Sequence, residues 1–172
     1  MLYEFEGYKP RLHDTVFVAP GVHIIGDVSI EAYSSIWFNS TLRGDLSPIR
    51  IGQHVNLQDN SVVHVDRDLP TELGDYVLVG HNVVLHGCKV GQASLIGMGA
   101  ILLDGSRVGE RAMIGAGSLV KQGQEIPSGV LAVGSPARVI RELKQEETDL
   151  IIRYSKNYSR RAQAYKQDLK TL

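Results

Sequence analysis

The sequence predicts a mainly β protein, a parallel β-solenoid of hexapeptide repeats followed by a C-terminal α-helix. Two patterns predict this fold class. An aliphatic residue recurs, mostly every six residues, and glycine often follows it; beyond the last repeat, a second apolar stripe has the spacing of a helix. The repeat positions are Val18, Ile24, Ile30, Ile36, Leu42, Ile51, Leu57, Val63, Leu73, Val79, Leu85, Val90, Ile96, Leu102, Val108, Ile114 and Val120.

The six-residue period matches neither the two-residue period of a strand nor the 3.6-residue period of a helix. Each unit therefore points one aliphatic residue inward from a short strand and then turns. Three units make one triangular coil. Coils stacked about 4.8 Å apart pair as parallel strands and bury the aliphatic column. A β-sandwich is the alternative, but its strands lack a fixed period and its loops vary in length.

The chain divides into two segments. We expect residues 1–143 to form the solenoid domain, with an N-terminal lead-in and a closing strand from Arg138 to Leu143. Residues 144–172 should form a helix that packs on the solenoid or on a neighbouring subunit. Its apolar stripe recurs at steps of three and four residues, as one face of a helix requires. The stripe consists of Ile151, Tyr154, Tyr158, Ala162, Tyr165 and Leu169.

Composition argues against several classes of protein. The formal net charge is −1 and charges of both signs are interspersed, so we expect no nucleic-acid partner. No stretch approaches the roughly 20 apolar residues of a membrane span, and the N-terminus lacks the pattern of a signal peptide. Cys88 is the single cysteine and can form no internal disulfide. We therefore expect a cytoplasmic protein with no membrane partner.

Three irregular steps interrupt the repeat. Three extra residues lie within 42–51 and four within 63–73, whereas the step across 85–90 is one residue short. Interruptions of a solenoid are the places where loops and sites tend to lie. If each is a corner bulge that leaves the count of faces unchanged, units three apart stack on the same face. The units that begin at Leu42, Val63 and Leu85 then form one column.

This column predicts a metal site. It places Arg43, His64 and His86 at equivalent positions, so the two histidines lie one coil apart, about 4.8 Å between backbones. Their rings can converge to the roughly 3.4 Å separation of tetrahedral zinc ligands. His81 belongs to the preceding unit and faces another direction, but a neighbouring subunit could supply it. The spacing thus predicts an interfacial site with two histidines from one chain and His81 from the next.

Other polar residues accompany these histidines. Gln58 and Asp59 lie in the unit stacked beneath His81, with Asp59 at the matching position. Arg43 lies in the histidine column, and Asp45 follows it two residues later. We expect these residues to orient the ligands and to pair across the interface, Arg43 with Asp59 of the neighbour. Ordinary pairing between subunits is the simpler alternative. The remaining histidines, His13, His23 and His54, are expected to be polar turn residues.

Five segments resemble the γ-class carbonic anhydrase family: Arg43–Asp45, Asn56–His64, Gly80–Cys88, Ile96–Ala100 and Gly134–Arg138. The match spans nearly all of the solenoid, and three histidines in context make it specific. The resemblance implies a left-handed parallel β-helix that assembles as a homotrimer. It also implies one divalent metal ion per interfacial site. Zinc is the first expectation, while iron, cobalt and nickel also suit imidazole ligands.

The activity implied by the resemblance is metal-dependent hydration of CO2 to bicarbonate, a lyase reaction. The resemblance assigns metal binding to His64, His81 and His86. It implies that Gln58 contacts metal-bound water or bicarbonate. It also implies that three further residues shape the interface: Arg43, Asp45 and Asp59.

The sequence departs from the best-characterised members of that family at two points. Leu46 follows Asp45 where those enzymes carry a glutamate, and the loop after His64 is short where theirs is longer and acidic. Glu72 and Asp66 are candidate proton shuttles, although each is more simply a solvated loop residue. The rate of CO2 hydration is therefore left open.

Two other functions remain open at this point. A hexapeptide acyltransferase or small thioester hydrolase would share the solenoid and use one histidine as a base. A non-catalytic assembly subunit would keep the metal only to hold its subunits together. The same solenoid supports all three functions, so the fold does not decide among them.

Overall fold

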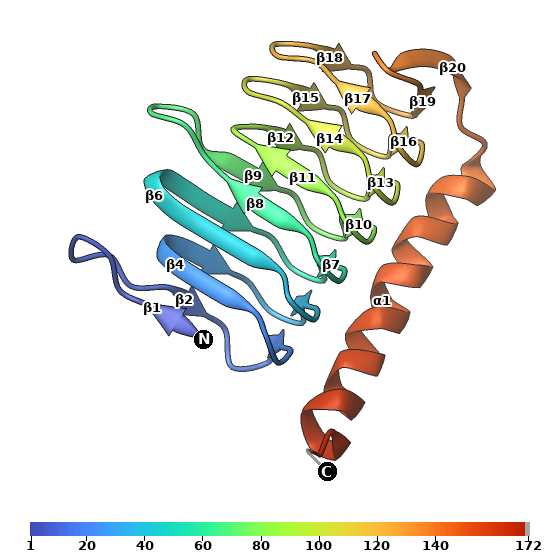
Figure 1. The fold of residues 1–172 in the computed structure, drawn as a ribbon. Coiled ribbons are helices and arrows are strands. Elements are labelled where there is room, and N and C mark those ends of the chain that lie inside the picture. Colours follow the sequence, from blue (N-terminus) through green and yellow to red (C-terminus); the bar gives the residue numbers. More distant parts are fainter. Residues whose placement is uncertain (171–172) are drawn as a thin grey trace.

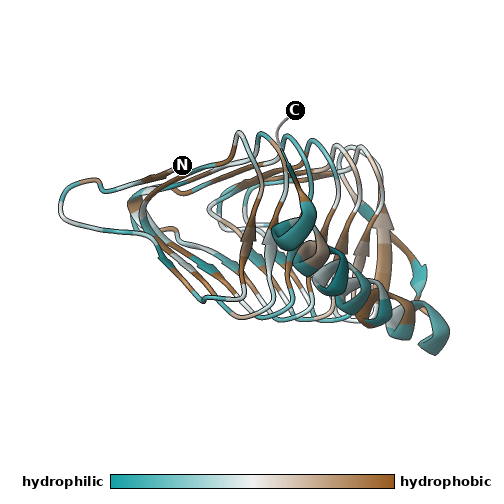
Figure 2. Cartoon of the chain, turned by 90° about the horizontal axis from the view of Figure 1, so that it is seen from below, coloured by the Kyte–Doolittle hydropathy of each residue, from teal (hydrophilic) through white to brown (hydrophobic). Residues whose placement is uncertain are grey.

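The protein is a triangular parallel β-solenoid of about seven turns with one long helix beside it (Figure 1). The structure, a computed structural model, describes residues 1–170. The predicted fold class, a mainly β parallel solenoid with a C-terminal helix, is confirmed. Viewed from below in Figure 2, the successive coils follow one another in a staggered row and the helix runs alongside them.

Face 1 of the solenoid is the eight-stranded sheet. Its strands pair in parallel from coil to coil, and the last strand closes the face by pairing antiparallel with the one before it. This is the closing strand that the sequence predicts. The strands of face 1 are β3 (Phe17–Val18), β5 (Ser35–Ile36), β7 (Asn56–Leu57), β10 (Leu78–Val79), β13 (Leu95–Ile96), β16 (Met113–Ile114), β19 (Val130–Val133) and β20 (Arg138–Glu142).

Faces 2 and 3 belong to one twelve-stranded sheet, because two long strands, β4 (His23–Ile30) and β6 (Thr41–Ile51), bend around the corner between them. Face 2 contains their first halves together with β1 (Leu2–Tyr3), β8 (Val62–His64), β11 (Val84–His86), β14 (Ile101–Leu102) and β17 (Leu119–Val120). Face 3 contains their second halves together with β2 (Arg11–Leu12), β9 (Thr71–Leu73), β12 (Lys89–Val90), β15 (Arg107–Val108) and β18 (Glu125–Ile126).

The aliphatic column forms the core. Leu42 pairs in register with Val63, and Val63 with Leu85, and all three are fully buried. The extra residues in β6 form a bulge, since Gly26 pairs with Gly44 whereas the next aligned pair is Val28 with Ile49. The interruptions therefore preserve the face count, as the column argument requires.

Backbone spacing explains the glycine that often follows the aliphatic residue. A Cβ atom on Gly91 would lie 2.6 Å from the backbone nitrogen of Glu110 in the next coil, so no side chain fits there. At the corner between faces 1 and 2, the sequence places Asn39, Asn60 and Asn82 in the left-handed region, with φ near +60°. Asparagine tolerates this conformation better than most residues do.

Helix α1 (Gln145–Asp168) runs back along face 1 towards the N-terminal coils (Figure 1). It contacts β3, β5, β7 and β10 of its own chain. Its first turn is fixed by Glu147, whose carboxylate accepts from the backbone N–H of Lys144 at 2.8 Å and pairs with Arg141. Within residues 1–170 no helix is both long and apolar enough to cross a membrane.

The buried side of the helix differs from the expected stripe. Ile151 and Ala162 are buried as expected, but Tyr154 and Leu169 are each 45% exposed. Instead the helix buries Ser155 and Ser159. The physical reason is that α1 lies over a solenoid corner, where the hydroxyls of Ser155 and Ser159 donate to the carbonyl oxygens of His54 and Tyr33.

Aromatic packing anchors the C-terminal half of the helix. Trp37 of the corner after β5 meets Tyr165 at 5.0 Å and Tyr158 at 6.0 Å between ring centroids, both edge to face. Phe17 lies 5.3 Å from Trp37 and completes the cluster. Such pairs contribute roughly 0.5–1.5 kcal/mol beyond the burial of area. The stripe tyrosine Tyr158 is thus a packing residue.

Candidate metal centre

The two column histidines meet at the end of face 2. β8 ends at His64 and β11 ends at His86, and the two residues pair directly in the parallel register. His64 Nδ1 lies 3.0 Å from His86 Nε2, with the ring centroids 4.9 Å apart. Both side chains are largely shielded from solvent, with exposed fractions of 15% and 31%. The stacking is the one that the repeat spacing predicts.

Each ring also contacts a carboxylate through its other nitrogen. His64 Nε2 lies 3.0 Å from Asp45 Oδ1, and His86 Nδ1 lies 2.5 Å from Asp104 Oδ1. An ionised carboxylate only accepts hydrogen bonds, so each histidine must carry its proton on the nitrogen that faces the carboxylate. The nitrogens that face each other therefore both carry lone pairs when the rings are neutral.

Two lone pairs at 3.0 Å repel each other unless a cation lies beside them. A divalent ion with nitrogen ligands near 2.1 Å separates tetrahedral donors by about 3.4 Å, so a small rotation of either ring would admit one. The donor set, neutral imidazoles backed by carboxylates, is the type that metal sites commonly use. The residues present therefore fit a metal ion.

Asp45 is ionised at neutral pH. Burial alone raises the pKa of its carboxyl group, but hydrogen bonds from His64 and Arg43 outweigh burial and lower the pKa below its usual value. Arg43 forms its ion pair with Asp45 of the same chain. The carboxylate is therefore shared between a guanidinium and an imidazole.

His81 lies apart from this pair, at the corner between faces 1 and 2. Its Nδ1 lies 2.8 Å from Oδ2 of Asp59, which occupies the matching position one coil below, as the spacing predicts. Among residues 1–170, no group of three or more His, Cys, Asp or Glu side chains is arranged to hold a metal ion. One chain thus brings two of the three expected ligands together and leaves the third elsewhere.

Gln58 is held by a short polar chain. Its amide nitrogen donates to Asn56 Oδ1 at 3.1 Å, and Asn56 in turn donates to Ser35 Oγ at 3.1 Å. Asn56 and Ser35 are buried, so these two fixed side chains orient the Gln58 amide. The expected contact of Arg43 with Asp59 of a neighbour stays a prediction.

Similarity to known proteins is extensive. Residues 87–122 match the sequence family described as bacterial transferase hexapeptide (six repeats). A carbonic anhydrase of Geobacillus kaustophilus is 45% identical over 166 residues, which cover 96% of this chain and 91% of that protein. The chain belongs to the γ-class carbonic anhydrase family. "Gamma carbonic anhydrase 1, mitochondrial" of Arabidopsis thaliana is 46% identical over 91% of this chain, which spans 59% of the length of that relative.

Solved structures show the same fold. A hexapeptide transferase family protein of Anaplasma phagocytophilum superimposes with a TM-score of 0.92 and 37% identity, over 96% of this chain and 98% of that one. The relatives of this chain thus bear two kinds of name, carbonic anhydrase and transferase. The fold alone therefore does not distinguish the two activities, and function has to be inferred from the side chains of the site.

Asp104 is the residue that the sequence interpretation missed. It follows His86 by 18 residues, whereas the coil at this point is 17 residues long, because Leu85 pairs with Leu102. Asp104 therefore lies one position beyond the residue stacked on His86, and its carboxylate reaches back past Gly87 to the imidazole. A search for acidic residues within one position of the residue stacked on each histidine would have found it.

Each expected proton shuttle has a partner other than the histidine pair. Glu72 projects from face 3 and pairs with Lys89 at 2.9 Å. Asp66 lies in an exposed turn and accepts from the backbone N–H of Arg67 at 2.7 Å. Asp66 is the exposed loop residue that the sequence favours, whereas Glu72 lies in strand β9 and not in a loop.

Cys88 does not contribute to the site as a thiolate. The residue is fully buried, and burial raises the pKa of its thiol to about 12. A thiol with that pKa is protonated at neutral pH and is therefore a poor nucleophile and a poor metal ligand.

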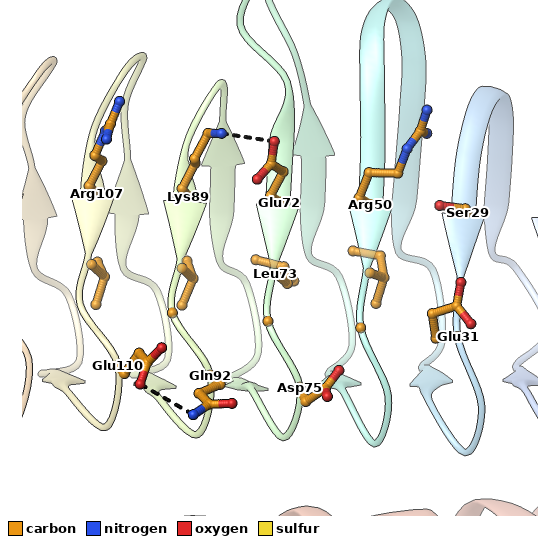
Figure 3. A pocket seen from close by; sticks show the side chains of 16 residues that line it. Ser29, Glu31, Arg50, Glu72, Leu73, Asp75, Lys89, Gln92, Arg107 and Glu110 are labelled. Carbon is orange, nitrogen blue, oxygen red and sulfur yellow. Dashed lines mark hydrogen bonds and ion pairs between the residues drawn. The ribbon is translucent and has the colours of Figure 1, made fainter.

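A broad groove lies on face 3, away from the histidines (Figure 3). Its volume is about 750 Å³, and charged side chains of both signs line it. Several are already paired, such as Glu72 with Lys89, and Gln92 with Glu110 at 3.2 Å. The charged and polar side chains of the groove project in rows from the stacked strands of face 3. The lining residues do not converge on one point as catalytic groups would.

Proposed function

We propose that the protein is a metal-dependent carbonic anhydrase that hydrates CO2 to bicarbonate at sites shared between subunits. The observation that carries the proposal is the pair of facing lone pairs on His64 and His86, each fixed by a carboxylate. The name of the Geobacillus kaustophilus relative, a carbonic anhydrase, supports the same reaction. An acyltransferase base would need one histidine and no facing partner.

The side chains of face 2 support assembly with further copies. Its outward positions are mostly apolar, and Val62 and Ile101 are 41% and 38% exposed. The outward positions of face 3 have the same strand geometry but are charged. Apolar surface gains free energy when it leaves water. The matched rows are Thr41, Val62, Val84, Ile101 and Leu119 on face 2, and Arg50, Glu72, Lys89, Arg107 and Glu125 on face 3.

We assign face 2 to the interface of a homotrimer. The histidine pair lies at the end of this face, and His81 lies on its other flanking corner. A neighbour packed against face 2 would bring its own corner, with its own His81, towards the pair. Three such contacts close a ring, and each interface then holds one three-histidine site.

The proposed metal is zinc. Bound there, it would act as a Lewis acid and lower the pKa of a water molecule towards neutrality. The protein's own groups have distinct parts. His64 and His86 hold the ion from one chain, Asp45 keeps His64 in the required tautomer, and the Gln58 amide orients water or bicarbonate. The single buried Cys88 also supports the proposed location in a reducing compartment, the cytoplasm.

Mixed oligomers test the shared site. His64→Ala and His81→Ala proteins, each purified alone and reconstituted with zinc, should be metal-poor and inactive in stopped-flow CO2 hydration. When the two are refolded together, a mixed trimer joins an intact pair from one chain to an intact His81 from the next. Metal content and activity should then recover, up to one site per mixed trimer. A site within one chain could not be restored in this way.

The other outcomes are equally informative. No recovery in mixed trimers verified by mass spectrometry would contradict the interfacial site. Acetyl-CoA turnover that persists in a chelator would assign the protein to the acyltransferases. Stoichiometric metal without any turnover in the wild-type protein would assign it an assembly role.

A further inference from the structure

We propose that Asp104 is a positioning residue. It fixes the ring of His86, so that His86 is the more rigidly held of the two histidines that bind the metal ion from one chain. The contact of 2.5 Å between Asp104 Oδ1 and His86 Nδ1 is the shortest of the three histidine–carboxylate contacts; those of His81 and His64 measure 2.8 and 3.0 Å. The proposal rests on the proposed function for the metal, but the tautomer of His86 can be measured without any metal.

The carboxylate of Asp104 occupies a space that Gly87 leaves open. Gly87 follows His86 and has a φ of +52°. A Cβ atom at Gly87 would lie 2.7 Å from Asp104 Oδ1, inside any ordinary contact distance. The absence of a side chain at residue 87 therefore lets the carboxylate reach down one coil to the imidazole.

The turn that carries Asp104 is held on both sides by backbone hydrogen bonds. Gly105 N–H donates to the carbonyl oxygen of Gly87 at 2.7 Å, and Gly123 N–H donates to the carbonyl oxygen of Asp104 at 2.8 Å. The stacked coils below and above thus fix the position of the acceptor. A preorganised acceptor holds one ring orientation without a further entropic cost at metal binding.

The two carboxylates of the pair have unequal tasks. Asp45 divides its oxygens between Arg43 and His64, whereas the only side-chain hydrogen bond of Asp104 within residues 1–170 is that with His86. An undivided acceptor polarises its imidazole more strongly and raises the basicity of the other ring nitrogen. His86 is therefore the fixed and stronger ligand, and His64 is the one that can adjust.

The direct test uses Asp104→Asn, with Asp68→Asn as the control. Asp68 is an exposed carboxylate on the same corner, so both variants lose one negative charge. In metal-free protein, ¹⁵N NMR of the imidazoles should show His86 protonated on Nδ1 in the wild type and in the control. In Asp104→Asn the amide can donate to Nδ1, so the Nε2–H tautomer should become populated. Zinc affinity, measured by chelator competition, should fall about 10- to 100-fold.

Two further variants separate positioning from folding. Asp104→Glu restores an acceptor and should recover part of both the Nδ1–H tautomer and the zinc affinity. Gly87→Ala keeps the carboxylate but fills its space, so it should reproduce the tautomer change. A wild-type tautomer and wild-type zinc affinity in Asp104→Asn would overturn the proposal. Failure of the wild-type protein to bind zinc would instead contradict the proposed function, and the tautomer measurement would still decide whether Asp104 positions His86.

Discussion

His54 donates its Nδ1 proton to the hydroxyl oxygen of Ser159, 105 residues later in the chain, at 2.9 Å. The donor is the imidazole, because the single hydroxyl proton of Ser159 is directed to the carbonyl oxygen of Tyr33, also at 2.9 Å. The His54 ring is stacked between Tyr33 and Tyr76, with centroid distances of 5.1 and 5.0 Å. A buried serine thus joins helix α1 to a ladder of three rings on the solenoid corner.

Removal of this hydroxyl should weaken the docking of the helix. Ser159→Ala leaves the Nδ1–H of His54 and the carbonyl of Tyr33 without their partner in a largely buried place. We expect the free energy of unfolding in urea to fall by about 1–3 kcal/mol. Gln167→Ala, at an exposed position of the same helix, should change it little. Equal stability of the two variants would show that the hydroxyl is dispensable.

His54 should also make stability depend on pH. Burial first, and then the nearby charge of Lys156, lower the pKa of His54 from its ordinary value of 6.5, against a smaller opposing effect of Asp75. The unfolded chain therefore binds a proton more readily than the folded one. The contribution of His54 to stability is fully present above about pH 6.5 and is lost as the pH falls through the lower, folded pKa.

This dependence can be measured by urea unfolding of the wild type and of His54→Gln between pH 5 and pH 8. The wild type should lose more stability on acidification than the variant does, because glutamine does not titrate. Parallel pH profiles would mean that other groups cause the acid sensitivity.

The repeat register is the part of the molecule that the sequence predicts best. A fixed period determines which residues stack, so the approach of His64 and His86 follows from counting. The buried serines of α1 could not be found in this way, because their partners are backbone carbonyls of corners far away in the chain. Ser155, for example, donates to the carbonyl of His54. Asp104 lies one position off the stacked register and outside the motifs that carry the resemblance, so counting repeat positions does not find it.

A charge on face 2 should prevent assembly. Val62→Glu places a carboxylate within the apolar row next to the histidine column, where a neighbouring copy would have to desolvate it at a cost of several kcal/mol. Light scattering should show a monomer for this variant and a trimer for the wild type. Arg107→Glu, at an outward position of face 3, is the matched control and should remain a trimer. A trimeric Val62→Glu protein would exclude face 2 as the interface.

Gln58→Ala should separate metal binding from turnover. The amide of Gln58 is directed at substrate in our proposal, so zinc content should stay near that of the wild type. Loss of one oriented hydrogen-bonding group lowers rates by about 10²- to 10³-fold in well-studied enzymes, and we expect a decrease of that order in CO2 hydration. Gln53→Ala, at an exposed corner of the same coil, should leave both quantities unchanged. Loss of zinc from Gln58→Ala would make this residue structural.

Helix α1 joins the two ends of the repeat array. It begins beside the closing strand, where Arg141 pairs with Glu147, and near its end Gln163 donates to the carbonyl of Thr15 at 2.8 Å. In an open array each repeat contacts only its neighbours, so terminal repeats can fray alone. Here the first coil cannot unfold without disturbing helix α1, which also packs against the later coils that contain β5, β7 and β10. The solenoid therefore unfolds as a more cooperative unit than its linear architecture alone would allow.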